Sequence, residues 1–515
     1  MESAVPPLLL RDLLARNAEI YPNDRAVVCG TVTRTWTQLQ ERVFRLANRL
    51  RQAGVDRGDR IIAVQRNGAE IPEIYFAAAL LGAMTVPISN WLTEAEASYI
   101  VSDSTPAFAF VEAGHAATAA FANVPTVATK SPAYEDFLAA GSADEPPEVE
   151  TAGDPVFLMY TSGTTGRPKG VVTTQSAMIQ NGWHILLSQD MTHDDVFLSS
   201  TPLTHAAAGT RVFSMALDGH AHVILERYTA EAFIEAVETH GVTVTILVPT
   251  MIKALLDSEA FDAARLSSMR VLIYGAAPTP LNLVERAAAM LPCGLLHSYG
   301  QTETGTALTV LTPDEHRRFL ADPATKSRAS SIGRVIAGVR MKIVDEDGVE
   351  LPAGQAGELV VRSTKGMIGY WHLPEATASV LSAGWIRTGD VASKDDDGYY
   401  FLHDRQKDMF ISGGLNVYPL EIERVLLGVP GILECAVVGG ADDHWGEVPV
   451  AFIVGTPELL TAAQEACAAQ LAGYKQPKRY EFVDSLPRNG TGKVMKPELR
   501  DRLRSMAALL PEDAS

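Results

Sequence analysis

The stretch Tyr160–Gly170 reads YTSGTTGRPKG and directly follows the apolar run PVFLM at 155–159. Its glycines and Pro168 form a flexible turn, in which backbone N–H groups can approach an anion without hindrance from a Cβ atom. One serine, three threonines and Lys169 add further donors. A Walker A loop is excluded because glycine, and not serine or threonine, follows the lysine. The composition predicts a loop that binds a polyphosphate, with a polar surface loop as the alternative.

Around this loop, short β-branched runs alternate with amphipathic stretches through about the first 300 residues. The run RIIAVQRN (60–67) precedes a helical pattern at 71–81, which is followed by MTVPIS (84–89). The same alternation recurs at PAFAFVE, HAHVILE, VTVTILVP and MRVLIYGAAP. This alternation predicts βαβ units, in which helices cover parallel sheets.

The pattern changes after Ser330. The segment VRMKIVDEDGVELPAGQAGELVVRS (339–363) alternates with a period of two and contains DG and AG turns. It predicts antiparallel hairpins or a small barrel. Beyond Arg405, short strands such as ECAVVGG mix with helical stretches such as LEIERVLLG. We therefore predict a domain boundary near 405–408.

Composition and charge exclude several classes of function. The chain has 43 Lys and Arg against 62 Asp and Glu, a net charge of −19 that repels nucleic-acid backbones and anionic lipid. Its four cysteines have neither metal-ligand spacing nor the density of a disulfide framework. Residues 1–24 lack the features of a signal peptide, and the apolar segment 75–88 is too short to span a bilayer. We expect a soluble, cytoplasmic protein with no nucleic-acid partner and no membrane span.

Three further segments carry candidate ligand groups. HSYGQTETG (297–305) offers an aromatic ring for a nucleobase and Glu303 for the Mg²⁺ that accompanies ATP. WIRTGD (385–390) and the following Arg405 offer a carboxylate and a guanidinium, the usual partners of ribose hydroxyls. PRNGTGKVMK (487–496) presents a lysine on a glycine-containing loop. Taken singly, each also fits a solvated residue or a surface ion pair.

Together and in this order, these segments resemble the adenylate-forming superfamily of acyl-CoA synthetases, non-ribosomal peptide adenylation domains and luciferases. The resemblance covers nearly the whole chain and is closest to bacterial aryl- or medium-chain acyl-CoA ligases. It implies an α/β fold with a large N-terminal domain (1–406) of two βαβ subdomains and a small β-barrel. A smaller, mobile α+β domain (407–515) follows, with the active site between the two. A carboxylate would attack the α-phosphate of ATP, and a thiol would then displace AMP from the acyl-adenylate.

The resemblance assigns roles to residues at matching positions. Lys493 would bridge the carboxylate and the α-phosphate, and Glu303 would support Mg²⁺ together with Thr161. His205 would gate the acyl pocket, and Tyr299 would flank adenine. The full set expected to contact ATP is Thr161, Ser162, Gly163, Thr164, Thr165, Lys169, Gly275, Ala276, Ala277, Tyr299, Gly300, Gln301, Thr302, Asp390 and Arg405.

The thiol step is implied by SGGLNVYP (412–419), which resembles the family segment that lines the pantetheine tunnel. This segment and Lys493 share the small domain but serve different half-reactions, so the domain is expected to rotate about Lys407. Gln476 and Trp91 depart from the pattern, because a basic residue is common at both positions. The residues expected to contact coenzyme A are Gly413, Gly414, Trp445, Tyr474 and Lys478.

The acyl pocket is expected to accept an aromatic or medium-chain acid. The small residues at 206–208 leave room for such a group, and no Asp stands where amino-acid adenylation domains hold an α-amino group. The matching positions are His184, His205, Ala206, Ala207, Leu247, Gly300 and Ala307.

The sequence thus predicts an acid–CoA ligase that uses ATP, Mg²⁺ and coenzyme A. One alternative is a stand-alone adenylating enzyme that loads an acyl group onto a carrier protein, although 330–405 lacks a long insertion typical of fatty acyl-AMP ligases. A luciferase-like oxygenase and a non-catalytic ATP-binding scaffold are further alternatives. The sequence does not decide whether the protein forms a homodimer.

Overall fold

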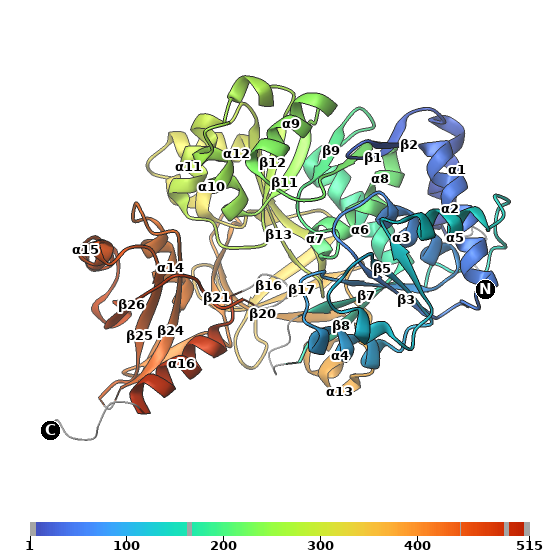
Figure 1. Cartoon of the computed structure of the whole chain (residues 1–515). Helices are drawn as coiled ribbons and strands as arrows, with labels where there is room; N and C mark the ends of the chain where they lie inside the picture. Colours follow the sequence, from blue (N-terminus) through green and yellow to red (C-terminus); the bar gives the residue numbers. More distant parts are fainter. Residues whose placement is uncertain (1–6, 162–166, 443, 489–493, 509–515) are drawn as a thin grey trace.

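Four sheets organise the computed structural model, which describes residues 7–161, 167–442, 444–488 and 494–508. Figure 1 shows a large N-terminal part, coloured blue to orange, and a smaller C-terminal part in red. The predicted α/β class is confirmed.

The first sheet has seven strands in the order β18-β8-β7-β4-β3-β5-β6. Its centre is parallel, whereas β8 and β18 are antiparallel to their neighbours. The strands are β3 (Arg60–Val64), β4 (Met84–Ile88), β5 (Phe108–Glu112), β6 (Thr126–Thr129), β7 (Pro155–Thr161), β8 (Lys169–Thr174) and β18 (Gly369–Tyr370). β3, β4 and β5 are buried almost throughout, as expected of parallel strands covered on both faces.

The second sheet has nine strands in the order β15-β14-β13-β12-β11-β9-β10-β1-β2. Six central strands are parallel, and antiparallel strands flank them on both sides. The strands are β1 (Arg25–Cys29), β2 (Val32–Thr35), β9 (Val196–Ser199), β10 (Ala221–Ile224), β11 (Val244–Leu247), β12 (Val271–Gly275), β13 (Gly294–Gln301), β14 (Gly305–Leu311) and β15 (Arg334–Val335). The two sheets confirm the predicted pair of βαβ subdomains.

The largest hydrophobic core joins residues of both sheets through the helices between them. The helix predicted at 71–81 is α3 (Glu70–Leu80), which is buried on almost every side. Tyr75 on α3 packs edge-on against Phe157 of β7 at 4.9 Å, and its hydroxyl donates to the Leu203 carbonyl at 2.9 Å. This contact fixes the loop after β9.

The remaining helices of the N-terminal part cover the two sheets or connect their strands (Figure 1). They are α1 (Leu10–Ile20), α2 (Trp36–Gln52), α4 (Glu94–Ser104), α5 (Pro132–Ala139), α6 (Gln175–Gln189), α7 (Ala206–Gly209), α8 (Arg211–Asp218), α9 (Ala230–His240), α10 (Pro249–Asp257), α11 (Leu281–Met290), α12 (Pro313–Ala321) and α13 (Pro374–Val380). Within the described part of the chain, no helix is long and apolar enough to cross a bilayer.

The segment predicted as hairpins or a small barrel forms a five-stranded antiparallel sheet. Its strands are β16 (Val339–Val344), β17 (Gly357–Ser363), β19 (Leu381–Ser382), β20 (Trp385–Lys394) and β21 (Tyr400–Arg405). The strand order is β16-β17-β20-β19, and β21 also pairs with β20. This sheet lies in the part of the chain for which a small barrel is predicted.

The C-terminal part has its own five-stranded sheet and its own hydrophobic core. Its strands are β22 (Phe410–Ser412), β23 (Leu415–Val417), β24 (Glu434–Asp442), β25 (Gly446–Val454) and β26 (Arg479–Val483). Its helices are α14 (Pro419–Leu427), α15 (Leu460–Gln470) and α16 (Lys496–Ala508). The predicted boundary at 406/407 falls between β21 and β22.

Candidate active site

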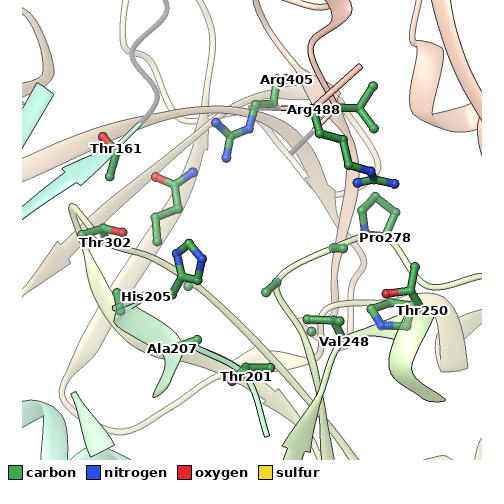
Figure 2. A pocket seen from close by; sticks show the side chains of 18 of the residues that line it. Thr161, Thr201, His205, Ala207, Val248, Thr250, Pro278, Thr302, Arg405 and Arg488 are labelled. Carbon is green, nitrogen blue, oxygen red and sulfur yellow. The ribbon is translucent and has the colours of Figure 1, made fainter. Parts of the chain in front are cut away.

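A cleft of about 980 Å³ lies between the N-terminal and C-terminal parts. Loops that follow the parallel strands β9, β11 and β12 form part of its wall, which is the usual place for a ligand in an open α/β sheet. Figure 2 shows Arg405 and Arg488 approaching from one side, with Thr201, Ala207 and Val248 across from them.

One corner of the cleft combines a carboxylate with hydroxyl groups. Thr161 Oγ1 at the end of β7 donates to Glu303 Oε1 at 3.1 Å, and the Tyr370 hydroxyl donates to the same oxygen at 3.4 Å. Lys169 Nζ lies 5.1 Å from the centroid of the Tyr370 ring. All four residues line the cleft.

This corner suits Mg²⁺ in the form in which ATP carries it. The described residues contain no cluster of three or more His, Cys, Asp or Glu side chains that could hold a metal by themselves. Mg²⁺ typically binds through one or two carboxylates together with substrate phosphates and water. Glu303 and Thr161 therefore fit a Mg²⁺ ion that arrives with the nucleotide.

A second corner is built around the buried carboxylate of Asp390. The Tyr299 hydroxyl and Gln301 Nε2 donate to Asp390 Oδ2 at 2.6 and 2.7 Å, and Arg405 Nε lies 3.2 Å from Oδ1. Asp390 on β20 pairs directly with Arg405 on β21, so the sheet itself sets this geometry. Burial and the carboxylate both raise the pKa of Tyr299, which keeps its hydroxyl protonated and able to donate.

Tyr299, which is predicted to flank adenine, contacts Asp390 in this structure. The side chain is buried behind the cleft wall, and its hydroxyl orients Asp390. The neighbouring Gly300, Gln301 and Thr302 line the cleft, as do Gly275, Ala276 and Ala277. Gly275 permits close packing of two strands, because a Cβ there would meet the Ser298 carbonyl oxygen at 2.1 Å.

The predicted acyl residues His205, Ala206, Ala207 and Gly300 line the cleft. Leu247 does not: it is fully buried in the core on the other face of β11. Its neighbours Ile246 and Val248 line the cleft instead, because alternate side chains of a strand point to opposite faces. The structure therefore places Ile246 and Val248 at the cleft, and Leu247 one residue away from it on the opposite face.

Ala307 and His184, which are also predicted for the acyl pocket, lie outside the cleft lining as well. Ala307 is buried in the core, and its neighbour Thr306 lines the cleft in its place. His184 lies outside the cleft lining, with its ring against Gly338. Burial and the charge of Lys365 lower the pKa of His184 to about 4, so its imidazole is neutral.

The C-terminal part contributes Leu486, Arg488 and Val494 to the cleft. Arg488 also donates to Glu434 at 2.7 Å. It was not singled out from the sequence, although it stands in the same motif as Lys493. The predicted residues Ser162, Gly163, Thr164, Thr165 and Lys493 lie outside the described residues.

The residues predicted for coenzyme A lie away from the cleft in this structure. The predicted set, Gly413, Gly414, Trp445, Tyr474 and Lys478, is absent from the described cleft lining. Gly413 N–H donates to the Trp445 carbonyl at 2.9 Å, and the Trp445 side chain is half exposed. Lys407, the predicted hinge, lies exposed between β21 and β22. Trp91 lies at the edge of the cleft and is 68% exposed.

Comparison with known proteins identifies this class of site. The sequence model of the AMP-binding enzyme family matches residues 14–371, and that of the AMP-binding enzyme C-terminal domain matches residues 421–493. The chain belongs to the AMP-binding enzyme family. Feruloyl-CoA synthase of Amycolatopsis sp is 39% identical over 494 residues, which cover 95% of this chain and 97% of that protein.

Two further similar proteins are a ligase named for a carrier-protein acceptor and a CoA synthetase of known structure. Fatty acid–[acyl-carrier-protein] ligase ScoC of Streptomyces coeruleorubidus is 35% identical, over 94% of this chain and 95% of that protein. The structure of o-succinylbenzoate CoA synthetase from Bacillus subtilis with its acyl-adenylate intermediate has a TM-score of 0.85 at 28% identity, covering 98% of both chains. The same enzyme has been solved with ATP and magnesium ion. The prediction of an ATP-dependent, AMP-forming acid–CoA ligase that uses ATP, Mg²⁺ and coenzyme A is confirmed.

Replacing Asp390 by asparagine is expected to raise KM for ATP about 10-fold or more, because hydrogen bonds to a charged group contribute about 1.5–3 kcal/mol each. An amide cannot accept from Tyr299, Gln301 and Arg405 as the carboxylate does. Tyr299→Phe is the matched control, since it removes one donor and keeps the charge. Steady-state kinetics at varied ATP concentration measure both variants. An unchanged KM in Asp390→Asn would contradict the expected role of Asp390 in binding the ribose of ATP.

Proposed function

We propose that this enzyme activates an aromatic carboxylic acid as its acyl-adenylate and transfers the acyl group to coenzyme A. The observation that carries the proposal is the composition of the cleft. Small or aliphatic side chains (Ala206, Ala207, Ile246 and Val248) line the cleft together with His205 and Glu303. An aryl group is proposed to pack against these side chains, and the proteins similar to this chain include a feruloyl-CoA synthase and an indoleacetate–CoA ligase.

The residues of the cleft divide the work of the first half-reaction. Asp390 and Arg405 are proposed to hold the ribose, and the backbone of 275–277 to flank adenine. Thr161 and Glu303 would hold Mg²⁺, which supplies charge neutralisation at the phosphates. Lys493 is proposed to bridge the carboxylate and the α-phosphate. Preorganised donors of this kind act mainly by stabilising charge as it develops.

The second half-reaction is proposed to follow a rotation of residues 407–515 about Lys407. The cleft here receives Arg488 and Val494, whereas Gly414 and Trp445 do not line it. A rotation would exchange these two faces and bring the coenzyme A residues to the acyl-adenylate. The location in the cytoplasm and the assembly as a homodimer stay predictions.

A carrier protein is the second candidate for the acyl acceptor, because the relative ScoC is named as a ligase of that kind. Coenzyme A and a carrier protein can be distinguished as acceptors by the product that accumulates. Purified enzyme is incubated with Mg-ATP and a pool of aryl and alkyl acids, with and without coenzyme A, and analysed by mass spectrometry. We expect aryl-CoA to form only when coenzyme A is present. Acyl-AMP that accumulates equally with and without coenzyme A would favour a carrier protein, and exclusive use of alkyl acids would contradict the aromatic substrate.

A further inference from the structure

A buried lysine lies behind the wall of the cleft. Lys365, which follows β17, is fully buried and does not belong to the cleft lining. No carboxylate in the described part of the chain forms an ion pair with it, and burial lowers the pKa of its ammonium group to about 7. Burying a cation without a carboxylate is costly, so the other contacts of Lys365 must offset this cost.

Those contacts go to a bulge in β14. The register of β14 against β13 shifts there, so that residues 306–308 lie opposite Gly300 alone. A bulge of this kind takes backbone groups out of the ladder of hydrogen bonds between two strands. Lys365 Nζ donates to two carbonyls of the bulge, those of Thr306 and, at 2.8 Å, Ala307. The lysine therefore supplies hydrogen bonds to a stretch of backbone at which the strand pairing is interrupted.

The backbone of the bulge is strained, and it packs directly against the cleft wall. Ala307 has a φ of +57°, a conformation that residues with a side chain rarely adopt. Such strain persists only where the surrounding contacts fix it, and it gathers at functional sites. Gly300 lines the cleft, and a Cβ there would meet Ala307 N at 2.9 Å and Thr306 Cα at 3.0 Å. A shift of the bulge would thus move the wall of the cleft.

The bulge is also tied to the small residues of the cleft. Thr306 lines the cleft, and its Oγ1 lies 3.0 and 3.1 Å from the amide nitrogen and oxygen of the fully buried Asn181. The same oxygen lies 3.5 Å from Thr210 Oγ1, and the Thr210 hydroxyl donates to the Ala206 carbonyl at 2.8 Å. Lys365 thus holds through its backbone the same residue that Asn181 and Thr210 hold through its side chain.

We propose that Lys365 is a positioning residue for the acyl end of the cleft, which fixes the bulge and so sets where Thr306 and Gly300 stand against the bound acid. This inference rests on the proposed function, because it takes the wall near Ala206 as the place of the acyl group. Lys365 acts through the backbone of its neighbours, since its own side chain does not reach the cleft.

The part of the same loop that is proposed to serve ATP has supports of its own. The Glu303 carbonyl accepts from Met367 N–H at 2.8 Å, and the Glu303 carboxylate accepts from the hydroxyls of Thr161 and Tyr370. None of these contacts involves the side chain of Lys365. Removing that side chain is therefore expected to weaken binding of the acid more than binding of ATP.

Lys365→Met keeps the length of the side chain and removes its charge and its donors. This variant is expected to raise KM for the acid about 10-fold, because small displacements of groups that position a substrate are costly. KM for ATP is expected to rise less, since the contacts of Glu303 remain. Pyrophosphate exchange with ferulate and with decanoate as probe acids measures both constants. An equal rise in KM for the acid and for ATP, or no rise in either, would overturn the inference.

Ala307→Gly separates positioning from stability. Glycine adopts a left-handed backbone without strain, so the bulge then needs less support from Lys365. Adding this change to Lys365→Met is expected to lower KM for the acid again. A loss of folded protein alone would reduce kcat and leave both KM values unchanged, which would contradict positioning. Exchange with decanoate and not with ferulate would count against the aromatic substrate of the proposed function, while the comparison of Lys365→Met with the wild type is still made with decanoate. The two failures are therefore distinguishable.

Discussion

Replacing Glu303 by glutamine is expected to lower the rate of acyl-adenylate formation about 10²–10³-fold, the usual cost of losing a group that stabilises developing charge. In the structure the Glu303 carboxylate lies 3.1 Å from Thr161 Oγ1, at the start of the loop expected to hold the phosphates. Glutamine keeps the size and one oxygen but removes the charge that attracts Mg²⁺. ATP–pyrophosphate exchange in the presence of the acid measures this step without coenzyme A.

Tyr370→Phe is the matched control for this variant. It removes a hydroxyl 3.4 Å from the same carboxylate oxygen and leaves the negative charge in place. We expect the exchange rate to fall by less than about 10-fold, because the variant removes a single hydrogen bond to the carboxylate. A second signature is the Mg²⁺ concentration needed for half-maximal exchange, which should rise in Glu303→Gln. Exchange at the wild-type rate in that variant would remove Glu303 from the metal site.

Much of the fold is predictable from local patterns of apolar residues in the sequence. The run RIIAVQRN and the apolar stretch after it become β3 and α3 within one or a few residues of the predicted limits. These elements are buried on nearly every side, so their continuous apolar character leaves few other arrangements. The residues proposed to bind the nucleotide could be singled out for a different reason, since each stands in a distinctive motif.

The acyl residues were less predictable because their positions depend on which face of a strand meets the cleft. In VTILV both faces of β11 are apolar, so the sequence alone does not separate Leu247 from Ile246 and Val248. Lys365 shows a stronger limit. Its local context, STKGM, is typical of an exposed turn, and only the packing of β14 against the residues after β17 buries it.

Substituting leucine for Gly414 is expected to block thioester formation about 100-fold or more while leaving acyl-adenylate formation largely intact. Displacements of about 1 Å at a reacting centre already cost about this much. In this structure a Cβ on Gly414 would meet no atom within 4 Å, and the residue lies outside the cleft lining. A Cβ atom at this position therefore meets no obstacle in the arrangement that presents Arg488. After a rotation about Lys407, the same side chain would occupy the proposed pantetheine path.

The backbone of Gly414 requires a separate control, because its φ of +80° lies in the left-handed region. A leucine there costs about 1–2 kcal/mol wherever it occurs. Gly398→Leu matches this strain, since Gly398 has φ +85° with no atom within 4 Å of its Cβ position and lies in the turn between β20 and β21. Supplied acyl-AMP and coenzyme A measure the second step directly, and pyrophosphate exchange measures the first. If both variants lose the two steps in parallel, strain explains the result; if only Gly414→Leu loses the second step, the two half-reactions use different faces of residues 407–515.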